Sequence, residues 1–225
     1  MKIELSKIFK YCPACGAKSL KIQSLKKHIT CSGCGFLYFH NVASASGAII
    51  EYKSRVLMLV RGCEPKIGML DLPGGFADYG ESAEDATKRE IFEELGINVY
   101  DLCYLTSAPN VYLYENVTYP TLDLFFTCTI DNPRDIVASS DEVGSFKFFE
   151  PARIPLDKIA FESSRKALEF YINLMRQKRK RSGFNLGALF GLEPLDLARC
   201  VFFARVFDVH VADIRQCAKP REHVR

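Results

Sequence analysis

The sequence contains no apolar run that approaches the roughly 20 residues a helix needs to cross a bilayer. We also expect no secretory signal, because the first residues are charged rather than uniformly apolar. We therefore expect a cytoplasmic protein that does not enter a membrane. Tryptophan is absent too, but nearly half of the 225 residues are apolar, which is enough to bury the core of one medium domain and a small module.

Neither sign of charge is in large excess, since the formal net charge is only +3. Residues 1–40 contain seven lysines and one acid, whereas residues 41–180 contain sixteen basic and twenty-one acidic side chains. The last 45 residues differ again, with six arginines and one lysine. We predict a small basic module over 1–40, a main domain over 41–180 and a tail over 181–225, to which no function is assigned.

Four of the nine cysteines form two C-x2-C pairs that are separated by fifteen residues. They are Cys12, Cys15, Cys31 and Cys34. Four thiolates at this spacing suit tetrahedral zinc, and a set without an open ligand position indicates a structural Zn²⁺ ion. Two disulfides are the alternative, which the missing secretory signal disfavours. Residues 1–40 are therefore expected to form a zinc ribbon, whose lysines are mainly solvated surface; contact with nucleic acid is the less favoured reading.

A cluster of carboxylates marks the segment that follows Gly75. Ser82 is a suitable helix N-cap and Gly96 a suitable stop, so residues 82 to 95 should form one helix. At about 100° per residue, Glu90, Glu93 and Glu94 share one face. Such crowding is unfavourable without a cation, which favours bound divalent ions over a solvated acidic face, the commoner alternative.

Two neighbouring features support a metal site. Arg89 stands four residues before Glu93 and can orient it. The segment Leu72-Pro73-Gly74-Gly75-Phe76 reads as a tight loop whose glycines allow backbone carbonyls to approach a metal or a phosphate closely. Together they indicate Mg²⁺ or Mn²⁺ held over a phosphate-bearing, nucleotide-derived substrate.

The rest of the main domain supplies strands and a second helix. Strand-like runs lie at 47–51, 56–61, 98–105, 121–129 and 146–149. Leu168, Tyr171, Ile172 and Met175 recur at helical spacing, which predicts an amphipathic helix over 162–178. This pattern predicts an α+β domain with a mixed sheet packed against helices.

Residues 75–97 match every fixed position of the Nudix box, so the chain resembles the Nudix hydrolases, which cleave nucleoside diphosphates linked to another moiety. The resemblance implies an α-β-α sandwich. It also implies that Glu90 and Glu94 are the principal Mg²⁺ or Mn²⁺ ligands, completed by the Gly74 carbonyl and a downstream acid, for which Glu142 is the choice. Glu93 would be a further ligand or order a metal-bound water, and either Glu93 or Glu142 could be the general base.

A zinc ribbon joined to a Nudix domain is similar to the NADH pyrophosphatase branch. That branch carries Ser-Gln-Pro-Trp-Pro-Phe-Pro after the box, where this chain has Ser107-Ala108-Pro109-Asn110-Val111-Tyr112-Leu113. The Gln, the Trp and two prolines are missing, so NADH, NAD, ADP-ribose, diadenosine polyphosphates, a flavin dinucleotide and NAD-capped RNA remain open as substrates. Relatives are often dimers, and by analogy a homodimer is expected here.

Four side chains are candidates for substrate binding. Tyr112 and Tyr114 offer rings on which a base could stack, and Asn110 could meet a base edge. The alternative for the tyrosines is packing on a core. Arg61, at the end of an apolar strand, could contact a phosphate or simply lie on the surface. The competing functional class is a non-catalytic metabolite sensor or nucleic-acid-binding regulator built on a Nudix domain.

Overall fold

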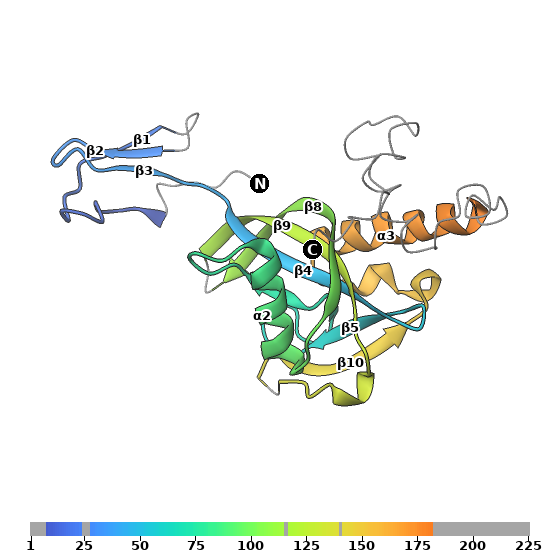
Figure 1. Ribbon diagram of the computed structural model, residues 1–225. Helices are drawn as coiled ribbons and strands as arrows, with labels where there is room; N and C mark the ends of the chain where they lie inside the picture. The colour runs from blue at the N-terminus through green and yellow to red at the C-terminus, as the bar shows by residue number, and fades with distance from the viewer. Residues whose placement is uncertain (1–7, 24–27, 115–116, 140, 182–225) are drawn as a thin grey trace, which may run out of the picture. The chain divides into compact units, whose positions relative to one another are not determined.

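A computed structural model describes residues 8–23, 28–114, 117–139 and 141–181, apart from the side chains of Gln23, Tyr114 and residues 179–181 (Figure 1). The chain divides into two compact units, residues 1–173 and 174–225, and the boundary falls inside the last helix. The predicted tail lies outside the described residues from position 182 onward, and so does the side chain of Tyr114. No helix of the described part is long and apolar enough to cross a membrane.

The amino-terminal module is a three-stranded antiparallel sheet in the order β1-β2-β3. Its strands are β1 Leu20–Gln23, β2 His28–Cys31 and β3 Leu37–Phe39. Ile29 and Cys31 are each 1% exposed, so this small module has one buried sheet face. The two cysteine pairs occupy the turns that precede β1 and follow β2.

The main domain is built on a mixed sheet whose strands lie in the order β10-β5-β4-β9-β8. The bounds are β4 Ala43–Tyr52, β5 Arg55–Arg61, β8 Tyr100–Tyr114, β9 Val117–Thr129 and β10 Val143–Phe149, with the short strands β6 Leu70–Asp71 and β7 Gly74–Phe76 beside β5 and β4. Strands β4 and β9 run parallel and the other pairs are antiparallel. The predicted mixed sheet is confirmed.

Two helices, α2 Ala83–Leu95 and α3 Glu162–Arg181, accompany the sheet (Figure 1). Ile91 and Leu95 of α2 pack with Ile50 and other side chains of one sheet face. Ile49, which points to the opposite face because side chains alternate along a strand, is also fully buried. Both faces are thus covered, as the predicted sandwich requires. Short 3-10 turns at Pro133–Asp135, Pro151–Arg153 and Leu156–Lys158 connect the later elements.

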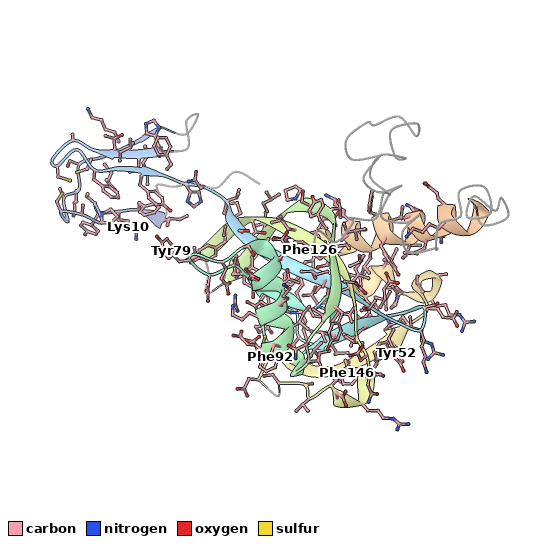
Figure 2. All side chains as sticks on the ribbon, viewed as in Figure 1. Lys10, Tyr52, Tyr79, Phe92, Phe126 and Phe146 are labelled. Atoms are coloured by element: carbon pink, nitrogen blue, oxygen red, sulfur yellow. The ribbon has the colours of Figure 1, made fainter. Side chains whose placement is uncertain are left out.

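Two expectations about local structure were wrong in detail. The segment over 72–76 was expected to be a loop, but Gly74–Phe76 forms strand β7 and pairs with β4. Gly74 (φ 141°) lies so close to β4 that an added Cβ would stand 2.1 Å from the Ser46 carbonyl oxygen, and only glycine allows that approach. The strand expected at 98–105 is Tyr100–Tyr114, because β8 continues along β9, where Phe126 lies inside the domain (Figure 2).

Candidate functional site

Helix α2 begins and ends at residues that its sequence predicts. The Ser82 hydroxyl accepts a hydrogen bond from the Asp85 amide at 3.1 Å, which caps the first turn. Gly96 adopts the left-handed conformation (φ 66°), and its amide bonds the Phe92 carbonyl. Ile91 and Leu95 anchor the inner face in the core, and this fixes the rotation of the helix and the direction of its acids.

Arg89 is the centre of an ion-pair network on α2. Its guanidinium donates to both carboxylate oxygens of Glu81 at 2.8 and 2.9 Å, to Glu90 at 2.9 Å and to Glu93 at 3.0 Å. It also donates to the Phe76 carbonyl at 3.0 Å, which ties the helix to the end of β7. These hydrogen bonds lower the pKa of Glu81 to about 2. The predicted Arg89–Glu93 contact is present. Glu93 is more exposed to solvent than Glu90 and Glu94.

Glu90 and Glu94 point inward and are largely shielded from water. The side chain of Glu90 is 15% exposed and Glu94 is 9% exposed. Burial raises the pKa of Glu90 against the opposing effect of Arg89, and Glu93 and Glu142 raise it further. Burial also raises the pKa of Glu94 well above its usual range; the Gly74 amide opposes this, while Asp71, Glu90 and Glu142 add to it. Because burial and neighbouring acids disfavour the charged forms of Glu90 and Glu94, a cation bound between them would stabilise these forms.

The loop before β10 brings a third acid toward this pair. The Ser139 amide donates to the Glu94 carbonyl at 2.8 Å, and the Gly62 amide donates to the Glu142 carbonyl at 2.8 Å. The loop is thus fastened to the end of α2 and to the end of β5. Glu142 is exposed, but its charge acts on both Glu90 and Glu94. Glu142 therefore lies within electrostatic range of Glu90 and Glu94, the two other acids that the sequence selected as metal ligands.

The donor set consists of carboxylate oxygens, which suit Mg²⁺ or Mn²⁺. Gly74 is adjacent as expected, although its amide, rather than its carbonyl, makes the observed contact: it donates to Glu94 Oε2 at 2.9 Å. Within the described ranges, only cysteines form a group of three or more candidate ligands whose donor atoms all lie within 4.8 Å of one another. The carboxylate ligands and the burial of Glu90 and Glu94 suit a divalent ion. Binding of an ion would require the carboxylate oxygens to move closer to one another than they are in this structure.

The four predicted cysteines do meet that criterion. The Cys12 and Cys34 sulfurs are 3.7 Å apart, and so are those of Cys15 and Cys31. Tetrahedral coordination with Zn–S bonds of about 2.3 Å gives sulfur separations of about 3.8 Å, so the cluster fits this ion. A disulfide needs about 2.05 Å, and all four cysteines are free. The disulfide alternative is therefore wrong for these residues.

The surroundings of these thiols shift the pKa values of Cys31 and Cys34 in opposite directions. Bonds from the Ser19 side chain and the Cys34 amide lower the pKa of Cys31 to about 6. The pKa of Cys34 rises to about 12, because the favourable Phe36 amide is outweighed by Cys15, burial and Cys12. One thiol ionises readily while its neighbour resists, so four thiolates need a cation among them.

Arg61 lies in a partly buried network that the sequence did not reveal. Its guanidinium donates to Asp71 at 3.1 Å and to the Pro65 carbonyl at 2.8 Å, and lies 5.0 Å from the centre of the Phe161 ring. Ser164 of α3 also donates to Asp71, at 2.9 Å. Burial raises the pKa of Asp71 despite Arg61. Asp71 could have been noticed in the sequence, because it is an acid between apolar residues. Nothing in the sequence pointed to Phe161, because it is distant along the chain from Arg61.

Tyr112 and Asn110 lie on β8 and have different surroundings. The Tyr112 ring is 5.5 Å from both Phe76 and Phe161, so the structure brings Tyr112 into the neighbourhood of Arg61. Burial raises the pKa of Tyr112, and Arg61 opposes the rise. The Asn110 amide donates instead to Asp123 at 3.0 Å. The contacts of the Tyr114 side chain lie outside the described residues.

The fold and the box residues define a NUDIX domain, and the profile of that domain matches residues 40–170, more than half of the chain. The chain belongs to the NUDIX family. The crystal structure of a NUDIX hydrolase from Nitrosomonas europaea superposes with a TM-score of 0.56 at 23% identity and covers 73% of this chain and 91% of that one. This likeness confirms the predicted fold class.

Two curated relatives are similar over the central part of the chain. The NAD-capped RNA hydrolase NudC of Haemophilus influenzae (strain PittGG) is 30% identical over 105 residues, which are 46% of this chain and 39% of that protein. The ADP-ribose pyrophosphatase of Methanocaldococcus jannaschii is 37% identical over 95 residues, 41% of this chain and 52% of that protein. The chain thus matches about half or less of the length of these relatives. The similarity to NudC confirms the predicted resemblance to the NADH pyrophosphatase branch.

Proposed function

We propose that this protein is a metal-dependent hydrolase that cleaves the pyrophosphate bond of a nucleoside diphosphate linked to another moiety, such as NADH, NAD, ADP-ribose or a related dinucleotide. The observation that carries the proposal is the pair of shielded acids, Glu90 and Glu94, whose pKa values are raised by burial and by Glu142. An acidic pair in this state is unfavourable on its own and becomes favourable beside divalent cations. The names of the two curated relatives agree with this chemistry.

The roles follow from position. Glu90, Glu94 and Glu142, with the Gly74 carbonyl, would hold Mg²⁺ or Mn²⁺. Bound ions of this kind screen a pyrophosphate and make a water acidic enough to attack near neutral pH. The protein contributes the fixed direction of the acids through the core packing of α2.

Arg89 and the general base complete the assignment. Arg89 would be a positioning residue, because it holds Glu93 and Glu90 in one network. Glu93 and Glu142 remain the two candidates for the base that accepts the proton of the attacking water, since both are exposed and both act on Glu90.

The substrate would lie against the side chains around Arg61. Tyr112, between two phenylalanines, would face a base or nicotinamide ring, and Arg61 would meet a phosphate. Asn110 would act through Asp123, and Tyr114 stays a candidate by its place on β8. Zinc in the cysteine cluster would be structural. A cytoplasmic location and a homodimer belong to the same proposal.

The test is a substrate panel with a matched variant. Wild type and Glu94→Gln are incubated with NADH, NAD, ADP-ribose, dinucleoside polyphosphates and NAD-capped RNA in Mg²⁺ or Mn²⁺. We expect wild type to cleave at least one substrate and the variant to lose at least about 100-fold in kcat/KM, because a lost charge on a metal ligand costs several kcal/mol of transition-state stabilisation. Wild type that is inert on every substrate but still binds a metabolite or nucleic acid would make the regulator alternative correct.

The same assay separates the candidate bases. Glu93→Gln and Glu142→Gln are compared by the pH dependence of kcat. The variant that lacks the base should lose the acidic limb of the profile, whereas a variant that only weakens metal binding should recover at high Mn²⁺ concentration.

A further inference from the structure

The outer face of the ribbon sheet combines exposed apolar side chains with positive charge. Directly opposed residues of antiparallel strands share a face, and the register opposes Lys21 to Thr30 and Thr30 to Leu37. The next row on the same face contains His28 and Phe39, which are also opposed. The opposite face contains Ile29 and Cys31, both buried, so the first face is the one turned away from the metal cluster.

The apolar members of this outer face remain in water. Leu37 is 50% exposed and Phe39 is 53% exposed, which is unusual for two large apolar side chains two residues apart. Phe39 makes an edge contact with His28, with ring centres 5.4 Å apart, so its ring has a defined orientation. The flat surface of an oriented, exposed ring is suited to stacking.

The charge of the ribbon module has one sign. Its described residues, 8–23 and 28–40, contain three exposed lysines and no acid; Lys21 belongs to the outer face, whereas Lys10, labelled in Figure 2, and Lys18 flank the first cysteine pair. Lys18 lies 5.4 Å from the centre of the Tyr11 ring, and Tyr11 is itself 52% exposed. Over residues 1–40 the sequence has seven lysines and one acid. A partner for this surface is therefore an anion that also presents flat apolar groups.

We propose that the ribbon face formed by Lys21, Thr30, Leu37, His28 and Phe39 binds single-stranded RNA, with a base stacked on Phe39 and phosphates near Lys21. Single strands are bound by aromatic side chains in a positively charged setting, and sheet faces are a common platform for this. The inference extends the proposed function and rests on it for its purpose: an RNA strand joined to the cleaved diphosphate would be held by the ribbon while the NUDIX domain acts on its end.

The experiment measures binding of an uncapped, fluorescein-labelled 12-nucleotide RNA to the full chain by anisotropy at low salt. The variants are Phe39→Ala and Lys21→Glu. The matched control is Phe170→Ala, which removes a phenylalanine that is 47% exposed on α3. Zinc content per chain shows that each variant keeps a folded ribbon. Hydrolysis of a small dinucleotide, measured on the same samples, reports the proposed function separately.

We expect Phe39→Ala to weaken RNA binding at least about fivefold, as loss of one stacked base would. Lys21→Glu should weaken it and reduce its dependence on salt. Phe170→Ala should bind as wild type does, and hydrolysis of the small dinucleotide should not change in any variant.

Three results would overturn the inference. The first is the absence of RNA binding by wild type at low salt, and the second is binding by Phe39→Ala that is as tight as that of wild type. The third is a fall in oligomeric mass for Phe39→Ala, measured by light scattering, with unchanged RNA binding, which would make the face a contact between copies of the chain. If Phe39→Ala loses zinc, Lys21→Glu and Leu37→Ser decide the outcome by the same criteria.

Discussion

Replacing Glu94 by Gln should raise the stability of the metal-free protein while it removes the response to metal. Glu94 is 9% exposed and carries its charge near Asp71, Glu90 and Glu142. Glutamine has nearly the same shape and keeps an oxygen that can accept from the Gly74 amide, now 2.9 Å from the carboxylate. Relief of a buried charge among like charges should therefore add about 0.5–2 kcal/mol to the free energy of unfolding.

In the presence of Mn²⁺, Glu94→Gln should be at a disadvantage to wild type, because it loses a metal ligand. A ligand at 100 times its Kd adds about 2.7 kcal/mol to stability. For a chain of this size each kcal/mol raises Tm by about 2–4 °C, so Mn²⁺ should raise the Tm of wild type by about 5–11 °C. Glu94→Gln should lose most of this rise.

The pH dependence gives a further check on the sign. A carboxyl group whose folded pKa lies above its usual value of 4.5 is more easily protonated in the folded state. Metal-free wild type should therefore lose stability as pH rises from about 4.5 through the raised pKa of Glu94, and the variant should lose less. Urea unfolding at several pH values, with and without Mn²⁺, measures all three effects.

The control is Glu84→Gln, which removes an exposed charge from the first turn of the same helix. It should cost only a few tenths of a kcal/mol and leave the Mn²⁺ response intact. The reasoning is refuted if Glu94→Gln is less stable than wild type without metal and keeps the full rise in Tm with Mn²⁺.

Three further predictions concern the scaffold. Cys31→Ser should reduce bound zinc from about one ion per chain to none, measured by mass spectrometry, and open the ribbon to limited proteolysis while the main domain resists; retained zinc would contradict the four-cysteine site. Gly74→Ala should cost at least about 3 kcal/mol in urea unfolding, because its Cβ would lie 2.1 Å from a backbone oxygen of β4, whereas Gly68→Ala, with open space around it, should cost about 1 kcal/mol; equal costs would contradict the close approach. Arg61→Met should cost about 3–5 kcal/mol by leaving Asp71 buried without its cation, and adding Asp71→Asn should recover part of the loss; additive costs in a double-mutant cycle would contradict the pairing.

The sequence predicted the local features of this protein because each is encoded within a few residues. The start and end of α2 depend on Ser82 and Gly96, which act on their own turn. The facing of Glu90 and Glu94 follows from helical periodicity alone. The four cysteines were identifiable by spacing, since a knuckle is a local structure. The roles of all these residues stay predictions.

Only the tertiary structure showed which distant groups share a site. Arg61 ends β5, Asp71 ends β6, and Phe161 and Ser164 lie at the start of α3, so no spacing rule could join these three segments. Asn110 looked free to meet a base but is bonded to Asp123, because β9 lies beside β8 in that register. The Gly74 segment became a strand because β4 was close enough to pair with it. Periodicity and caps act over one or two turns, whereas pairing and burial depend on where the rest of the chain is placed.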